Sequence, residues 1–151
     1  MGRMATRIYG CIVEYGLKAE MQSKIYAHNE KIIEQLPQGD EWPPLSRNMF
    51  AITDNYEGGP NLDYMGRIIH FGGNFKSFTY EWKEWKLKFE DLLTKLIWVE
   101  ADVHVTEFSE TQAFTWTVDL LKWNFDDKED LVPIKKEHWI SEGEHPWDFE
   151  K

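Results

Sequence analysis

The stretch from Thr79 to Val99 constrains the fold more than any other part of the chain. Its large apolar residues recur every three or four positions, which is the period of a helix that buries one side. The stripe consists of Trp82, Trp85, Phe89, Leu92, Leu93 and Leu96. We expect the helix to begin near Thr79, whose hydroxyl can cap the first amides, and to end at Trp98 or Val99. A stripe with this many aromatic residues requires a second layer of secondary structure to cover it.

Five stretches predict the strands of that layer, because they are short, rich in β-formers and bounded by turn residues. They are residues 7–15, 48–54, 64–71, 101–108 and 113–118. In the last pair Val103, Val105, Phe114, Trp116 and Val118 alternate with polar residues. This alternation predicts a hairpin with one face in the core and the other face polar.

A second helix is predicted between Leu17 and Leu36, where Pro37 and Gly39 end it. The element order is therefore β-α-β-β-α-β-β. This order favours an α+β fold with two helices packed on one face of a mainly antiparallel sheet of about five strands. A ferredoxin-like variant is the first expectation for its topology.

The chain divides by composition into a core and an acidic end. Residues 1–125 fit a single α+β domain. Residues 126–151 hold nine acidic and four basic side chains, with little periodicity. We expect them to form an irregular C-terminal segment that packs on the domain.

Charge and cysteine content exclude several classes of function. Seventeen basic against 27 acidic residues leave a formal charge of −10, which repels nucleic acid and favours a basic protein partner. The single cysteine, Cys11, suits a reducing compartment, and no apolar run is long enough for a membrane span. These features predict a cytoplasmic protein that binds neither nucleic acid nor membrane.

The segment "HFGGNFKSF", His70–Phe78, is the one candidate for a phosphate-binding loop. A P-loop needs Gly-Lys-Ser/Thr directly before a helix, and a dinucleotide fingerprint needs three spaced glycines. Here Asn74 and Phe75 separate the glycines from Lys76, so neither pattern is met. We interpret Gly72 and Gly73 as a bend that leaves the third strand, and we expect no nucleotide or other cofactor.

Metal and catalytic sites find little support in the sequence. His104 and Glu107 are three apart in a strand and so point to opposite faces, which predicts no metal site there. Cys11 is interpreted as a buried structural thiol. The best alternative is a small hydrolase or ligand-binding domain that uses the polar sheet face. That face comprises Asp102, His104, Thr106, Thr115 and Thr117.

Aromatic residues among carboxylates near the end of the chain predict a protein-binding surface, since rings anchor a partner and carboxylates steer a basic one. The candidate partner-binding residues are Trp123, Asp126, Asp127, Glu129, Asp130, Trp139 and Trp147. The alternative is that each Trp folds back over the edge of the core. A homodimer through an open strand edge is a further alternative.

The segment "GRIIHFGGNFKSFTYEWKEWKLKFEDLLTKLIWVEADVHVTEF", followed by "FTWTV", resembles small bacterial immunity proteins of polymorphic or contact-dependent toxin systems. The resemblance implies an intracellular protein that blocks a cognate toxin domain by occlusion, without catalysis or cofactor. It transfers no partner-binding residue to a position of this chain. The leading hypothesis is therefore an immunity-type protein that neutralises a basic toxin domain.

Overall fold

The fold was analysed in a computed structural model, which describes residues 5–15, 19–52, 67–77, 79–107, 110–119, 121 and 132–143. The element order is β1 (Ala5–Val13), α1 (Ala19–Glu34), β2 (Phe50–Ile52), β3 (Ile68–Lys76), α2 (Trp82–Leu93), β4 (Glu100–Glu107), β5 (Glu110–Val118) and β6 (Trp139–Glu142). Short 3-10 turns precede β2, α2 and β6. The predicted α+β class is confirmed.

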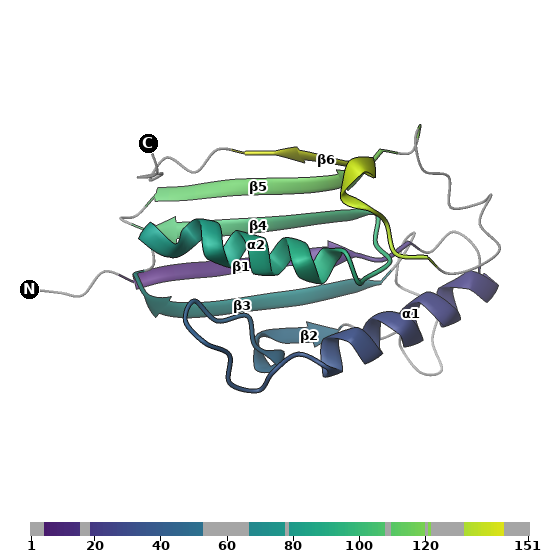
Figure 1. The fold of residues 1–151 in the computed structure, drawn as a ribbon, viewed down its shortest axis with the longest axis horizontal. Coiled ribbons are helices and arrows are strands. Elements are labelled where there is room, and N and C mark those ends of the chain that lie inside the picture. The colour runs from purple at the N-terminus through teal and green to yellow at the C-terminus, as the bar shows by residue number, and fades with distance from the viewer. Residues whose placement is uncertain are drawn as a thin grey trace, which may run out of the picture.

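The six strands form one antiparallel sheet in the order β2-β3-β1-β4-β5-β6. Figure 1 shows α1 and α2 on the same side of this sheet, with α2 lying across its centre. The expected count of about five strands is wrong by one. The missed strand is β6, which lies in the segment expected to be irregular and pairs with β5.

The core lies between α2 and the centre of the sheet. Alternate residues of the sheet point into it, with Ile8 and Ile12 on β1 and Val103 and Val105 on β4 all buried. On β5, Phe114, Trp116 and Val118 are buried, as their alternation predicts. Rings from α2 and the sheet pack against each other, for example Trp82 and Phe114, whose centroids lie 4.6 Å apart with 36° between the ring planes.

Helix α2 ends five residues earlier than the predicted Trp98, and its N-cap is Glu81 rather than Thr79. Leu96, Ile97 and Trp98 are all buried. Three consecutive helical residues spread over about 200° of the helix surface, so a helix could not bury all three against one sheet. Because the helix ends at Leu93, the three side chains can be buried together. Trp98 Nε1 donates a hydrogen bond to the Leu93 carbonyl at 2.9 Å.

The interpretation of Gly72 and Gly73 as a bend is wrong, because both lie inside β3. Among the described glycines, Gly143 alone has a positive φ. A Cβ on Gly73 would lie 2.3 Å from the ring of Phe75, so a larger residue there would displace that ring. Gly10, on the core side of β1, is required for space, since its Cβ would lie 2.1 Å from the backbone carbonyl oxygen of Asp102.

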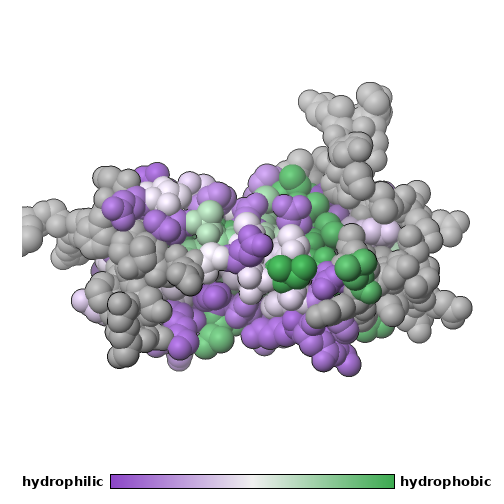
Figure 2. Space-filling view, turned by 90° about the horizontal axis from the view of Figure 1, so that it is seen from above, coloured by the Kyte–Doolittle hydropathy of each residue, from purple (hydrophilic) through white to green (hydrophobic). Residues whose placement is uncertain are grey.

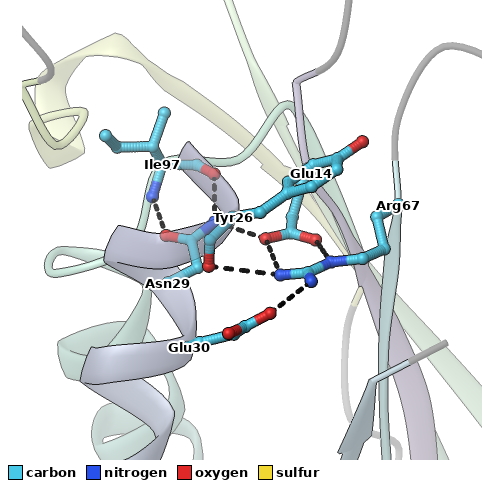
Figure 3. Close-up of polar contacts among 6 residues, drawn as sticks. All are labelled: Glu14, Tyr26, Asn29, Glu30, Arg67 and Ile97. Carbon is cyan, nitrogen blue, oxygen red and sulfur yellow. Dashed lines mark hydrogen bonds and ion pairs between the residues drawn. The ribbon is translucent and has the colours of Figure 1, made fainter. Parts of the chain in front are cut away.

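The end of β1, helix α1 and the start of β3 meet in a buried charged network (Figure 3). Arg67 is 3% exposed and donates to both carboxylate oxygens of Glu14, which is 0% exposed. Its Nη1 lies 2.5 Å from Glu30 Oε1, and its guanidinium lies 4.2 Å from the centre of the Tyr26 ring. Burial raises the pKa of Glu14, although hydrogen bonds from Arg67 and Asn29 favour its charged form.

Asn29 extends this network to the segment after α2. Its Nδ2 donates to Glu14 Oε2 at 2.9 Å and to the Ile97 carbonyl at 2.8 Å, while its Oδ1 accepts from the Ile97 amide at 2.9 Å. A single side chain therefore satisfies both backbone groups of a buried residue. The contact holds Ile97 in its non-helical position and ties α1 to the end of α2.

The acidic C-terminal segment is not irregular throughout. Trp139–Glu142 forms β6, and the preceding Ile134 is fully buried. Seen from above, onto the β6 edge, the surface mixes green and purple side chains (Figure 2). The exposed apolar residues of this part include Val132 and Ile140, each 45% exposed. The remainder of the segment, residues 126–131 and 144–151, lies outside the described residues.

Candidate functional site

The sheet face opposite the two helices is the candidate functional site, and we call it the helix-free face. Within the described residues no helix or strand packs on it. The strand registers place its side chains in cross-strand rows. The rows are Asn74–Arg7–Thr106–Thr111, Gly72–Tyr9–His104–Ala113, Ala51–His70–Cys11–Asp102–Thr115–Glu142 and Ile68–Val13–Glu100–Thr117–Ile140.

The predicted polar sheet residues lie together on this face. Asp102, His104 and Thr106 alternate along β4 with the buried core residues, and Thr115 and Thr117 do so along β5. Glu107 lies on the opposite side, where it is 1% exposed and accepts hydrogen bonds from Thr6 and Ser77. The prediction that His104 and Glu107 point apart is therefore confirmed.

Tyr9 and His104 form the centre of the helix-free face. Their rings stack at 5.1 Å between centroids with 7° between planes, and Tyr9 is 41% exposed. Of their neighbours in the same row, Gly72 has no side chain and Ala113 has only a methyl group. The ring pair therefore has no bulky side chain on either side of it in its row, and a partner can reach it from both sides.

Asp102 connects the ring pair to Cys11. One carboxylate oxygen lies 3.5 Å from His104 Nε2, and the other lies 3.5 Å from Cys11 Sγ. The expectation of a buried structural thiol is wrong, because Cys11 is half-buried on the helix-free face. Sequence reasoning missed this placement because both faces of β1 carry apolar residues. The structure identifies the core face, since Ile8 and Ile12 are buried and Cys11 lies on the other face.

The chemistry of Cys11 argues against a nucleophile. Burial, together with the nearby carboxylates of Asp102 and Glu100, raises the pKa of its thiol to about 11. A reactive cysteine needs the opposite environment, in which a cation or a helix N-terminus favours the thiolate. The thiol also faces Asp102 rather than His104, so the cluster does not form a Cys–His pair.

Carboxylates gather on one half of the helix-free face. Glu100 lies opposite Thr117, and Asp102 lies opposite Thr115, which in turn lies opposite Glu142 on β6. Glu100 and Glu142 are exposed. Three acidic side chains within adjacent rows, interleaved with threonine hydroxyls, form a surface that favours a cationic partner. We call Glu100, Asp102 and Glu142 the acidic rows.

Of the residues predicted to bind a partner near the end of the chain, Trp139 is the one described. Its ring contacts Trp98 edge-on at 5.3 Å between centroids, and its Nε1 donates to the Ile134 carbonyl at 3.2 Å. It is partly buried at the edge of the core. Trp123, Asp126, Asp127, Glu129, Asp130 and Trp147 lie outside the described residues.

No family model, curated protein or solved structure matches the chain. Within the described ranges, no three His, Cys, Asp or Glu side chains are grouped so that they could hold a metal ion. Neither described helix has the length and apolar character needed to cross a membrane.

Proposed function

We propose that the protein is a bacterial, cytoplasmic, immunity-type binding protein that neutralises a basic toxin domain by occlusion. The observation that carries the proposal is the helix-free face, with its exposed ring pair beside the acidic rows. An aromatic centre flanked by carboxylates has the composition of a binding surface for a cationic protein. The net charge of −10 adds long-range attraction for such a partner.

Part of this proposal concerns the topology. The segment from β1 to β4 follows the order β-α-β-β-α-β, with strands in the spatial order β2-β3-β1-β4. We propose that it is a ferredoxin-like core to which β5 and β6 are added. The addition widens the sheet on the side of β4, and it brings Thr115, Thr117 and Glu142 to the helix-free face.

The acidic segment after β5 has a second role in the proposal. Asp126, Asp127, Glu129 and Asp130 steer association, and Trp123, Trp139 and Trp147 anchor the complex. Changing the four acids to Asn or Gln is expected to slow association and to weaken its dependence on salt. An unchanged association rate would show that these four acids do not steer association.

The decisive experiment takes the product of the neighbouring gene as the candidate toxin and measures both binding and growth on co-expression. The double variant Glu100→Lys/Asp102→Lys reverses the acidic rows, and we expect it to weaken binding and abolish protection. The matched control is Glu81→Lys/Glu84→Lys, which makes the same charge change on the helix side of the sheet. Equal losses in the two variants would contradict a specific role for the helix-free face.

The alternative function is a small hydrolase or ligand-binding domain around His104. The protonated thiol of Cys11 and the stacking of His104 on Tyr9 give it no activated nucleophile in the described part of the face. His104→Ala, assayed in an activity screen, separates the two functions. If the unmodified protein turns over a substrate and this variant does not, the function is catalysis and not occlusion.

A further inference from the structure

A pocket of about 430 Å³ lies on the helix side of the molecule, away from the helix-free face. It is bounded by the last turn of α1, by the loop that follows α1, and by α2 with the turn after it. Its apolar wall consists of Ile32, Leu36, Leu45, Leu87 and Leu92. This volume and an aliphatic lining are typical of small-molecule sites, which often lie between helices.

The loop wall of the pocket is held in place by α2. Lys88 Nζ donates to Asp40 Oδ2 at 2.9 Å, to the Glu41 carbonyl at 2.9 Å and to the Pro43 carbonyl at 2.8 Å. These contacts use all three donors of the ammonium group. Trp85 Nε1 adds a hydrogen bond to the Pro44 carbonyl at 2.8 Å. The wall is therefore preformed, and a ligand would not have to order it.

The charges around the pocket are paired with each other. Lys88 is bound by Asp40, and Lys95 lies 3.2 Å from Asp91 on the rim. Burial of Asp40 opposes its ionisation, but hydrogen bonds from the Leu45 amide and from Lys88 keep its pKa below the ordinary value. Each acid among the lining residues thus has its own cation, which leaves no net charge to select an ionic ligand.

Leu87 is the exposed part of the apolar wall of this pocket. It is 53% exposed, although its neighbours Lys86 and Lys88 show that this part of α2 can carry polar residues. The inward stripe of α2 runs through Trp85 and Phe89, so Leu87 does not serve the core. It lines the pocket instead, where a bound apolar group would remove it from water.

We propose that this pocket between α1, its following loop and α2 binds a neutral, predominantly apolar small molecule. The site lies on the opposite side of the sheet from the proposed toxin-binding face. The two functions can therefore fail or succeed independently.

The test uses two fluorescent probes that differ by one charged group. N-phenyl-1-naphthylamine is neutral, and 1-anilinonaphthalene-8-sulfonate is the same molecule with a sulfonate. We expect saturable binding of the neutral probe with a stoichiometry of one, and binding of the sulfonate at least about tenfold weaker, because its charge finds no free partner among the lining residues. Equal affinities would overturn the assignment of a neutral ligand.

Two variants locate the bound probe. Leu87→Lys places a charge at the pocket and is expected to weaken binding of the neutral probe about tenfold, whereas Ile140→Lys, at a similarly exposed apolar residue of β6, should leave it unchanged. Asp91→Asn removes the acid that pairs with Lys95, so Lys95 becomes available to the sulfonate. We expect the difference in affinity between the two probes to become smaller in this variant.

The outcomes are distinct. Absence of saturable binding by the neutral probe, or equal weakening by Leu87→Lys and Ile140→Lys, would overturn the site. Circular dichroism of both variants confirms that the fold is retained, since both residues are on the surface. Protection against the toxin should persist in Leu87→Lys, so a loss of ligand binding is not confused with a loss of the proposed function.

Discussion

Arg67 and Glu14 form a bidentate ion pair at the junction of β1 and β3, with Nε 2.6 Å from Oε1 and Nη2 3.1 Å from Oε2. The backbone repeats the connection, because the Glu14 amide donates to the Arg67 carbonyl at 2.9 Å. The pair thus joins two neighbouring strands at the place where each meets α1. Its removal should affect the whole domain rather than one element.

Arg67→Met is expected to lower the free energy of unfolding by about 3–5 kcal/mol, because it leaves Glu14 buried without its cation. The deficit should grow between pH 5 and pH 8. In the variant the folded-state pKa of Glu14 lies above its unfolded value, so stability is retained at low pH and lost as the carboxyl ionises. Urea titrations at the two pH values measure this.

The control for the ion pair is Lys95→Met, which breaks the exposed Asp91–Lys95 pair and should cost less than about 1 kcal/mol. Glu14→Gln in the Arg67→Met background removes the buried charge and should abolish the added pH dependence. A deficit that is the same at pH 5 and pH 8 would show that Glu14 does not carry the effect.

Cys11 should react slowly with iodoacetamide in the folded protein. A thiol pKa of about 11 leaves about one thiolate in a thousand at pH 8, so alkylation should be roughly a hundredfold slower than in the urea-unfolded chain. Because the folded pKa is raised, this group stabilises the fold at neutral pH, and its contribution is lost as pH rises from about 9 through about 11. Asp102→Asn should lower the pKa and speed alkylation, which mass spectrometry can follow. A rate unaffected by Asp102→Asn would assign the shift in the thiol pKa to burial and Glu100.

Gly10→Ala should destabilise the protein by at least about 1–3 kcal/mol, since the new Cβ would overlap the Asp102 carbonyl oxygen and the Phe71 ring. Gly39→Ala is the matched control, because no atom lies within 4 Å of a Cβ at that position. It should change stability by less than about 0.5 kcal/mol. Thermal unfolding of the two variants compares them, and equal shifts would contradict the close approach of β1 and β4 at Gly10.

Trp139→Ala is expected to lower the free energy of unfolding by about 2–3 kcal/mol, since the ring packs against the fully buried Trp98. Trp139→Phe keeps the ring contact and loses only the hydrogen bond to Ile134, so it should cost about 1 kcal/mol. Both values come from chemical unfolding. If Trp139→Ala leaves stability intact but weakens toxin binding, Trp139 serves the partner rather than the core.

The sequence predicted those elements whose pattern is set by local burial. The alternation in β4 and β5 exists because one side of each strand faces α2, and it correctly placed Asp102, His104 and Thr115 on the other face. The stripe of α2 was recognisable for the same reason. Of the acidic rows only Asp102 was predicted, because Glu142 reaches them through β6 and the predicted strand began at residue 101, one residue after Glu100.

Other features depend on contacts between distant residues and have no local pattern. The end of α2 is set by Asn29, which is 68 residues from the Ile97 it binds. The glycines of β3 indicate a bend locally, but ring packing by Phe75 explains Gly73. β6 has four residues, too few for its alternation to be recognised, and pairing with β5 defines it.

The position of Ile134 and β6 has a consequence for folding during synthesis. A nascent chain that has delivered β1 through β5 still lacks a fully buried side chain and the strand that pairs with β5. Until those residues leave the ribosome, the outer hydrogen-bonding groups of β5 and part of the Trp98 ring stay open to water and to other chains. Translation speed and chaperone access over this interval should therefore govern how much of the protein reaches its native form.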